Sequence, residues 1–513
     1  MANIATYLNN IKNAVFGKEV RGSIHDGIKA MNEEVESTTS RQKVLDSTFE
    51  QLIINAGSSN AEVVAARVDE SGKSHDTLGK RLNSVDTQIK EKANENIWGY
   101  NQIIRDFSFP KEFNFSSLPN LKVKGNGECI HYLDVSNYEI KGKTYYVDIK
   151  TGLGDNDGLT PETPLSNIQV AIDKGDADTI IVGSGWYEHN HGYANTGILI
   201  NSSKKTVSIK AKGDGDVYIS ANSYNLSFSL EGDYTNVYSA SRSGVGRVID
   251  IKYKDNDGEF LELTKVSSIA EVENRANSYF TDNVKVYIHT KDNRSPDNNI
   301  KCLFNTIYPL QFHKDLYLEG IKIIGGKSPL KGGSGAKLYA KDCEYKFSTL
   351  ENGITINSSL AILQNCIANN NYLDGFNYNG GNVIEIGCKG FRNGVIGIEL
   401  VDTQNGSTQH NGGKIIRIGC EYGENKGSNV GDNHINTQSV NINVIAHNSR
   451  SENEQYNSNF TAHPNSEIWL YNCVSYGSKK DLLIQDKAKM HINNKNILDG
   501  IISNEGDGAL NAI

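Results

Sequence analysis

Carboxylates and imidazoles gather between residues 374 and 434 of this 513-residue chain. The candidate catalytic residues are Asp374, Asp402, Asp432, His410 and His434. Glycoside hydrolysis requires two carboxyl groups, about 5–5.5 Å apart for retention of configuration or about 6.5–9.5 Å apart for inversion. A polysaccharide lyase instead needs a base that removes a proton beside a uronate carboxylate, and histidine can act as that base. If the substrate is a glycan, these residue types could support hydrolysis or elimination.

Polar side chains with hydrogen-bonding capacity accompany these groups. The candidate substrate-binding residues are Asn377, Glu399, Arg392, Arg417 and Glu421. Amides, carboxylates and guanidinium groups supply the donors and acceptors that sugar hydroxyls need. The alternative is that these residues are solvated turn residues of the scaffold, in which case the same surface binds without catalysis or has no ligand.

A repeat of alternating apolar residues that ends in a small residue predicts the scaffold. The small residue recurs at Gly320, Cys343, Cys366, Cys388, Cys420, Ala446, Cys473 and Asn494. The successive spacings are 23, 23, 22, 32, 26, 27 and 21 residues. A period of this length is typical of a solenoid whose repeats stack on one another. We therefore predict a mainly β protein, a right-handed parallel β-helix, in which the cysteines stack inside as small apolar side chains.

A second column of the repeat aligns on Gly353, Gly375, Gly397 and Gly431. In the first three coils, the residues one and three positions after the glycine are apolar and are expected to point inwards. Asn377 and Glu399 then point outwards. In the fourth coil Asp432 and His434 occupy the apolar positions. Either the register slips and places Val430 and Ile435 inside, or the two polar groups lie at the wall of a groove.

The spacing of 32 residues between Cys388 and Cys420 implies about ten extra residues in one loop. We assign them to the polar, glycine-rich stretch 402–413, which would cover a glycan-binding groove along residues 374–434. Two other locations stay open. One is the inserted stretch 230–300, and the other is the cluster Trp186, Tyr187, His189 and His191, which could bind sugar or pack the first turn.

Heptad spacing of apolar residues at the N-terminus predicts self-association. Ile24, Met31, Leu45 and Leu52 share one heptad position. Such a seam is typical of coiled coils, and its mixed core is compatible with a homotrimer. The alternative is an amphipathic helix that packs on its own domain. The predicted divisions are 1–95, helical oligomerisation segment; 96–143, neck or adaptor; 144–229, β-helix cap and first rungs; 230–300, inserted β-rich module; 301–513, rungs and C-terminal end.

Two phrases carry a resemblance to known families. Residues 14–28, AVFGKEVRGSIHDGI, and 54–62, INAGSSNAE, resemble the opening of baseplate and tail-fibre proteins from phages of Gram-positive bacteria. Residues 154–164, GDNDGLTPETP, with the apolar strand before them, resemble the N-terminal cap of pectate-lyase-like β-helix proteins. The resemblance implies a phage tail fibre or tailspike in the virion, bound to baseplate or tail proteins through residues 1–95. It implies a host cell-wall or capsular polysaccharide as ligand and assigns no catalytic residue.

Composition narrows the function further. A net charge of −9 and an isoelectric point near 5.8 argue against nucleic acid as the main partner. No apolar run reaches membrane-spanning length, and the start has no secretory signal. The seven cysteines form no CxxC pair, and the stretch around Asp155 and Asp157 is no complete calcium loop, so neither metal nor cofactor is expected.

We expect a fibre that recognises, and in one interpretation depolymerises, teichoic acid, capsule or exopolysaccharide. The alternative is a non-catalytic receptor-binding or structural fibre.

Overall fold

The computed structural model describes residues 18–59, 80–81, 104–113, 115, 118–188, 197–223, 226–394, 404–434, 436–454 and 456–513. The chain divides into two compact units, Met1–Ile103 and Ile104–Ile513. In the first unit, α2 (Lys18–Ser59) is one helix of 42 residues. Apolar side chains of the heptad seam are exposed along it, with Met31 70% and Leu45 64% accessible. The helix therefore offers an apolar stripe that no described part of the chain covers; the trimer stays a prediction.

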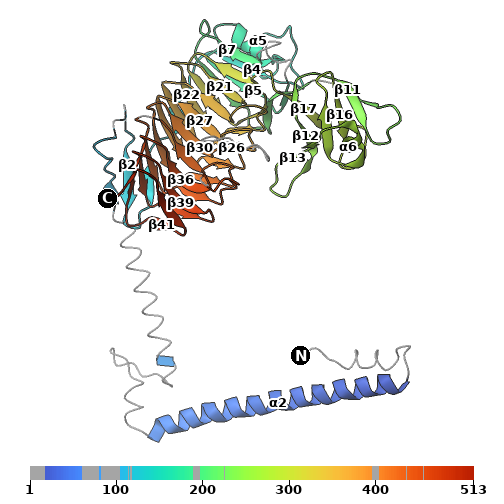
Figure 1. Cartoon of the computed structure of the whole chain (residues 1–513), viewed down its shortest axis with the longest axis vertical. Coiled ribbons are helices and arrows are strands. Elements are labelled where there is room, and N and C mark those ends of the chain that lie inside the picture. The colour runs from blue at the N-terminus through green and yellow to red at the C-terminus, as the bar shows by residue number, and fades with distance from the viewer. Residues whose placement is uncertain are drawn as a thin grey trace. The chain divides into compact units, whose positions relative to one another are not determined.

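The second unit is built on three long parallel sheets, which we number 1 to 3 (Figure 1). Sheet 1 contains β4 (Thr144–Val147), β5 (Thr179–Val182), β8 (Val207–Ala211), β19 (Leu316–Glu319), β22 (Lys337–Lys341), β25 (Leu360–Gln364), β28 (Asn382–Ile386), β31 (Lys414–Ile418), β34 (Gln438–Ile442), β37 (Glu467–Tyr471), β40 (Lys489–Ile492) and β43 (Ala509–Ala512). Sheet 2 contains β6 (Gly185–Tyr187), β9 (Val217–Ala221), β20 (Ile321–Gly325), β23 (Glu344–Lys346), β26 (Ile367–Asn369), β29 (Lys389–Phe391), β32 (Glu421–Gly423), β35 (Ile445–His447), β38 (Val474–Tyr476) and β41 (Ile497–Leu498). Sheet 3 contains β7 (Ile198–Ile200), β18 (Leu310–Phe312), β21 (Leu330–Gly332), β24 (Ile354–Ile356), β27 (Phe376–Asn379), β30 (Ser407–His410), β33 (Val430–Asp432), β36 (Ser458–Ala462), β39 (Lys480–Ile484) and β42 (Ile501–Asn504). Successive strands pass from sheet 1 to sheet 2 to sheet 3, so the protein is a parallel β-helix.

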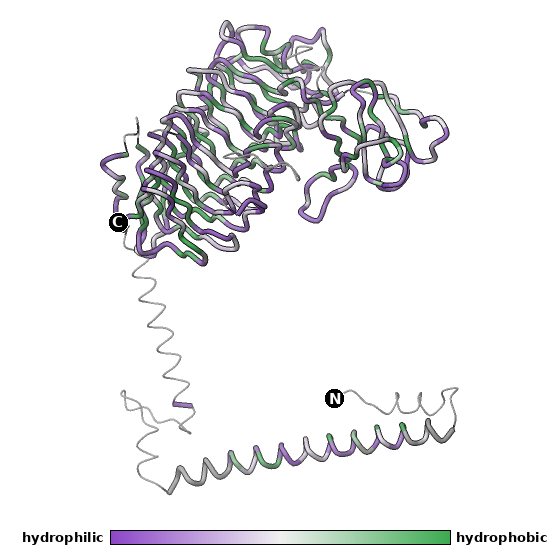
Figure 2. Tube along the Cα trace, in the orientation of Figure 1, coloured by the Kyte–Doolittle hydropathy of each residue, from purple (hydrophilic) through white to green (hydrophobic). Residues whose placement is uncertain are grey.

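The turn between sheets 1 and 2 explains the sequence repeat. In the seven coils from β19 to β38 one residue there adopts a positive φ, which glycine, asparagine and aspartate tolerate best: Gly320, Asp342, Asn365, Gly387, Gly419, Asn443 and Asn472. The next residue points inwards, and Cys343, Cys366, Cys388, Cys420 and Cys473 are all buried there as free thiols. Apolar and polar residues are interspersed along the coils of the solenoid (Figure 2).

Buried asparagines form a ladder at the turn between sheets 2 and 3. Asn371 donates to Asn393, Asn393 to Asn425, and Asn425 to Asn429, at 2.9–3.0 Å. The oxygen of each of the first two acceptors also receives a backbone N–H of the coil before it. The ladder therefore satisfies polar groups that would otherwise be buried without partners.

The outer face of sheet 1 carries apolar side chains and is covered by an N-terminal segment. This strap, residues 104–140, includes β1 (Ile104–Asp106), β2 (Leu121–Lys124), β3 (Cys129–His131) and the 3-10 helix η1 (Val135–Tyr138). Phe113 packs on Trp469 of β37, and Tyr138 stacks on Tyr339 of β22 at 4.4 Å. Most of the stretch predicted as a neck or adaptor (96–143) thus lies along the solenoid, from its C-terminal coils towards β4.

A short helix covers the first coil, and a separate module interrupts the solenoid. α5 (Ile168–Asp173) buries Ile168, Ala171 and Ile172 in the core at the end where β4 lies (Figure 1). Between β9 and β18 the chain forms two small sheets. Their strands are β10 (Ser229–Leu230), β11 (Tyr238–Ser241), β12 (Val245–Lys254), β13 (Phe260–Glu262), β14 (Thr264–Lys265), β15 (Ser278–Thr281), β16 (Lys285–His289) and β17 (Ile300–Phe304). The helix α6 (Ile269–Asn274) connects β14 and β15. This insert has its own apolar core.

None of the helices that the structure describes is both long and apolar enough to cross a bilayer.

Candidate functional site

Four of the predicted site residues lie together on sheet 3 and its turns. Asn377 donates to Asp374 at 2.8 Å and to Nε2 of His410 at 3.1 Å. The rings of His410 and His434 are 5.3 Å apart. Burial raises the pKa of Asp374 to about 6, although hydrogen bonds from Asn405 and Asn377 oppose it. Burial, followed by the charge of His434, lowers the pKa of His410 to about 4.

This group is nearly closed to solvent. Asp374 is 1% exposed and His410 8%, whereas His434 is exposed. The backbone N–H of Asn405 donates to Asp374 at 2.7 Å, so the carboxylate also holds the chain that leads into β30. In the described conformation His434 is therefore accessible from solvent, whereas Asp374 is not.

Asp432 and Arg417 lie inside the solenoid. Arg417 of β31 binds both carboxylate oxygens of Asp432 of β33, at 2.9 and 3.1 Å, and both side chains are fully buried. Arg417 also donates to Ser407 at 2.9 Å, and the buried Glu385 lies 3.8 Å from it. This corrects the expectation that Asp432 and Arg417 line a surface groove: opposite charges satisfy each other in the core, where neither meets a ligand.

Strand pairing explains how these residues were misassigned. Ser407 pairs with Phe376 on one side and Val430 on the other, so β30 is the strand after β27. β30 thus takes the place in sheet 3 that was predicted for residues 396–400, which lie outside the described residues. Val430 points inwards, as the slipped register predicted, and Asp432 points inwards with it; Ile435 lies outside the described residues.

The predicted covering loop 402–413 is also corrected. Residues 407–410 form β30, and the described residues 404–410 are buried. The extra chain lies between β29 and β30. Asp402 and Glu399 fall within this stretch, outside the described residues, so their roles stay predictions.

The other two predicted binding residues lie on sheet 2. Glu421 of β32 points outwards and pairs with Lys389 at 3.0 Å. Arg392 pairs with Asp257 of the insert at 2.8 Å. The described binding residues therefore do not form one site: Asn377 lies on sheet 3, Glu421 and Arg392 lie at sheet 2, and Arg417 lies in the interior.

A surface that faces the insert lies at the N-terminal end of sheet 2. Trp186 of β6 and Tyr218 of β9 are register partners, and their rings stack 4.4 Å apart. Phe260 of the insert tilts against both, at 5.9 and 5.8 Å. We call these three residues the aromatic wall. Sequence reasoning had singled out Trp186, while its neighbour Tyr187 is buried in the core and His189 and His191 lie outside the described residues.

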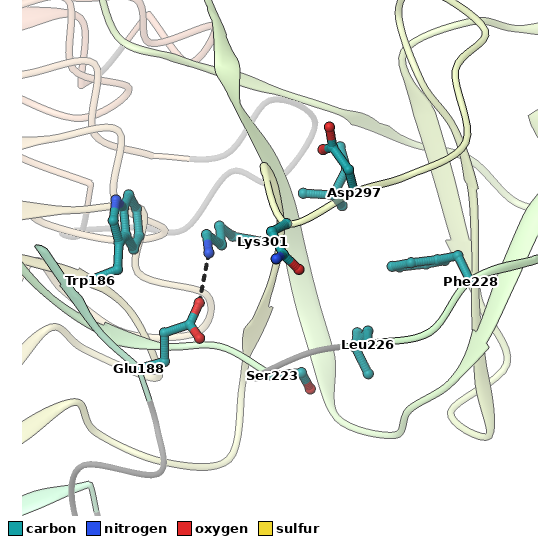
Figure 3. Close-up of a pocket in the computed structure, with 9 residues that line it drawn as sticks. Trp186, Glu188, Ser223, Leu226, Phe228, Asp297 and Lys301 are labelled. Carbon is teal, nitrogen blue, oxygen red and sulfur yellow. Dashed lines mark hydrogen bonds and ion pairs between the residues drawn. The ribbon is translucent and has the colours of Figure 1, made fainter. Parts of the chain in front are cut away.

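One pocket, of about 160 Å³, opens beside Trp186. Figure 3 draws Trp186 and Glu188 on the solenoid side, with Leu226, Phe228 and Asp297 opposite them. Lys301 pairs with Glu188 at 2.6 Å and lies 5.0 Å from the Trp186 ring. We call it the tryptophan pocket.

A second pocket, of about 180 Å³, opens beside Tyr218 and Phe260, and we call it the lysine pocket. Its charged lining residues are Lys254, Lys322, Lys346, Glu259 and Glu344. Lys346 bridges Glu259 at 2.8 Å and Glu344 at 2.7 Å, and Lys322 pairs with Glu344 at 3.1 Å. Burial acts to raise the pKa of Glu344, but Lys346 and Lys322 hold it below its ordinary value.

The two pockets suit binding better than cleavage. Aromatic faces and a few fixed polar groups are the usual lining of small-ligand sites. However, Glu188, Glu259 and Glu344 each pair with a lysine. Because hydrolysis needs one protonated carboxyl group, ion-paired carboxylates are poor general acids. By contrast, burial raises the pKa of Asp374.

A metal site is not apparent in the described parts of the chain, where no group of three or more His, Cys, Asp or Glu side chains is arranged to hold an ion. Asp157, from the acidic turn, instead accepts hydrogen bonds from the Leu159 amide and the Thr163 hydroxyl.

Comparisons with known proteins show similarity of fold to solved structures. No family model matches the chain, and no curated protein does. Among solved structures, one described as a glycoside hydrolase is 8% identical with a TM-score of 0.50, and the match covers 72% of this chain and 96% of that one. XylC in complex with xylose is 12% identical, with a TM-score of 0.44 and coverage of 69% and 70%. A pectate lyase is 12% identical, with a TM-score of 0.38 and coverage of 72% and 80%. At 8% identity, the similarity to the glycoside hydrolase shows a shared fold.

Proposed function

We propose that this chain is a phage tail fibre or tailspike that recognises a host cell-surface glycan. The observation that carries the proposal is the aromatic wall, Trp186, Tyr218 and Phe260, with a polar pocket on each side. The three rings are partly buried in an apolar cluster between insert and solenoid, and the parts that stay exposed can pack against the apolar faces of sugars. The paired charges beside them offer fixed donors and acceptors to hydroxyl groups.

The size of the pockets favours a polymer. Pockets that enclose a drug-sized ligand measure roughly 300–1,000 Å³. The two pockets here, of about 160 and 180 Å³, are smaller, and stacked aromatic rings join them. Such an arrangement holds neighbouring groups of one extended molecule, which suits teichoic acid, capsule or exopolysaccharide.

Attachment to the virion rests on the N-terminal segment. Residues 14–28 and 54–62 resemble the opening of tail-fibre and baseplate-associated proteins. In this proposal residues 1–95 bind baseplate or tail proteins and associate three copies. The insert and solenoid then present the glycan-binding surface to the host.

A second candidate function is depolymerisation of the same glycan. The raised pKa of Asp374 and the neutral His410 beside it favour this candidate, since a protonated carboxyl group and an unprotonated imidazole can act as acid and base. The glycoside hydrolase with the similar fold adds support. Access to Asp374 would require movement of the chain between β29 and β30.

The test is retention of the full-length chain on glycans purified from Gram-positive cell walls and capsules. Trp186→Ala removes one face of the aromatic wall, and we expect the dissociation constant to rise about tenfold or more, as for hot-spot aromatics. Tyr253→Ala is the matched control, because Tyr253 is an aromatic residue of the insert outside both pockets. Equal binding by both variants would contradict the proposed surface. Release of reducing ends or of unsaturated sugars, abolished by Asp374→Asn, would establish the second candidate.

A further inference from the structure

Among the described residues, the lysines of the lysine pocket are not all paired. The ammonium groups of Lys254, Lys322 and Lys346 line the pocket with the carboxylates of Glu259 and Glu344, and Asp216 lies beside Lys322. Lys346 and Lys322 each form two ion pairs. Lys346 binds Glu259 and Glu344, and Lys322 binds Glu344 and Asp216. These ion pairs hold the floor of the pocket in one arrangement.

Lys254 differs from the other two lysines. It ends β12 of the insert, and its ammonium lies 3.6 Å from the centroid of the Phe260 ring. Within the described residues no carboxylate lies at ion-pairing distance from it. Burial lowers the pKa of Lys254; Glu259 opposes this change, and the charges of Lys346 and Lys322 reinforce it. Its N–H groups are therefore available to an anion in the pocket, and a bound anion would offset the repulsion from the other two lysines.

The geometry points to a subsite for an acidic substituent of the glycan, a carboxylate or a phosphate, that Lys254 binds in the lysine pocket. This inference rests on the proposed function and specifies its ligand class: an acidic polymer whose neutral ring packs on the aromatic wall. Tyr218 connects the two halves, because it lines the lysine pocket and stacks on Trp186 of the tryptophan pocket. The overall charge of −9 does not oppose this, since ions beyond a Debye length of about 8 Å are largely screened at physiological salt.

The experiment compares three probes that share one ring: glucose, glucuronate and glucose 6-phosphate. Dissociation constants are measured on the full chain by calorimetry or by ligand-observed NMR at low salt. We expect at least one acid to bind about tenfold more tightly than glucose, as a charged hydrogen bond implies. This preference is expected to weaken as salt is added. The acid that binds more tightly than glucose shows whether the subsite takes a carboxylate or a phosphate.

Lys254→Gln removes the charge and keeps most of the side chain, so it is expected to abolish the preference for the acid over glucose. Lys254→Arg is expected to retain the preference. Lys291→Gln is the matched control, because Lys291 is exposed on the insert, lies over the Tyr253 ring and lines neither pocket. Circular dichroism establishes that each variant folds.

Two outcomes overturn the subsite: acids that bind no more tightly than glucose, or a preference that survives in Lys254→Gln. If wall glycans still bind through Trp186 in either case, the proposed function stands without the subsite. If the acids bind through Lys254 but no wall glycan is retained, the subsite stands and the proposed function fails.

Discussion

Arg417 and Asp432 form an ion pair in the interior of a β-helix, where most inward positions are apolar. Arg417 is held by Asp432, Ser407 and Asn441, and Glu385 lies beside it with hydrogen bonds from Tyr378 and Tyr422. Charges so fully buried are tolerated only when each one is paired and hydrogen-bonded. The group therefore fixes the positions of three neighbouring coils relative to one another, and its role is structural.

Asp432→Asn is expected to lower the free energy of unfolding by about 3–5 kcal/mol, because it leaves the guanidinium of Arg417 buried with no opposite charge bound directly to it. Glu421→Gln, which breaks an exposed pair with Lys389, is the control and is expected to change it by about 0–1 kcal/mol. Denaturant titration followed by circular dichroism measures both. Equal stability of the two variants would show that Arg417 finds another partner or becomes solvated.

The strap is the element on which sheet 1 depends. Its residues Phe113, Phe115, Leu121 and Val135 form one apolar cluster with the outer face of the sheet. Without them Ile362, Ile384, Ile416, Val440 and Trp469 would face water, and a contiguous apolar face of this kind drives aggregation. A parallel sheet is usually covered on both faces, and here the chain covers the outer face of sheet 1 with its own N-terminal segment.

A chain that starts at residue 104 is expected to fold and remain soluble, whereas one that starts at residue 144 is expected to aggregate or bind a hydrophobic dye. In the full chain, Phe113→Ala is expected to destabilise by about 3–5 kcal/mol, as for other buried phenylalanines. Light scattering and dye fluorescence compare the two truncations. If both remain monodisperse and do not bind the dye, the strap is dispensable for the solenoid.

At the scale of the whole molecule, the two units differ in how their apolar residues are covered. In the solenoid they are buried in a core, whereas on α2 no other described residue covers them. Met31, Val35, Leu45 and Phe49 are all more than half exposed on α2. An isolated amphipathic helix of this length buries nothing by itself, and association with identical copies is the simplest way to cover the stripe. The β-helix is capped at its first coil by α5 and has its own core, so the two units can serve separate tasks.

We expect the full chain at micromolar concentration to have about three times its monomer mass of 56.4 kDa, because heptads with a mixed apolar core favour trimers. Replacing Met31 and Leu45 by lysine is expected to give a monomer with an intact β-helix. Light scattering after size-exclusion chromatography measures the mass, and circular dichroism tests the fold. A wild-type monomer would contradict the trimer and leave attachment to a partner helix as the use of the stripe.

The local parts of this structure could be read from the sequence. A period of 21–32 residues, alternation along strands, and a glycine, asparagine or aspartate before an inward cysteine are properties of one coil and its neighbours. They depend on backbone conformation and side-chain burial, which follow simple rules. The stretch 230–300 was likewise visible in the sequence as a change of pattern.

The candidate site depended on contacts between distant residues. The strand register, in which Gly431 pairs with Thr408, decides whether Asp432 faces water or Arg417. The sequence repeat does not reveal this register, because an extra stretch of chain precedes β30. Trp186 and Tyr218 became part of a wall because Phe260, from an insert that leaves the solenoid, folds back against them. Burial and pairing across dozens of residues are set by which elements pack together, and a period along the chain does not contain that information. For this reason the sequence predicted a glycan-binding β-helix, while only the tertiary structure located the surface that we propose binds the glycan.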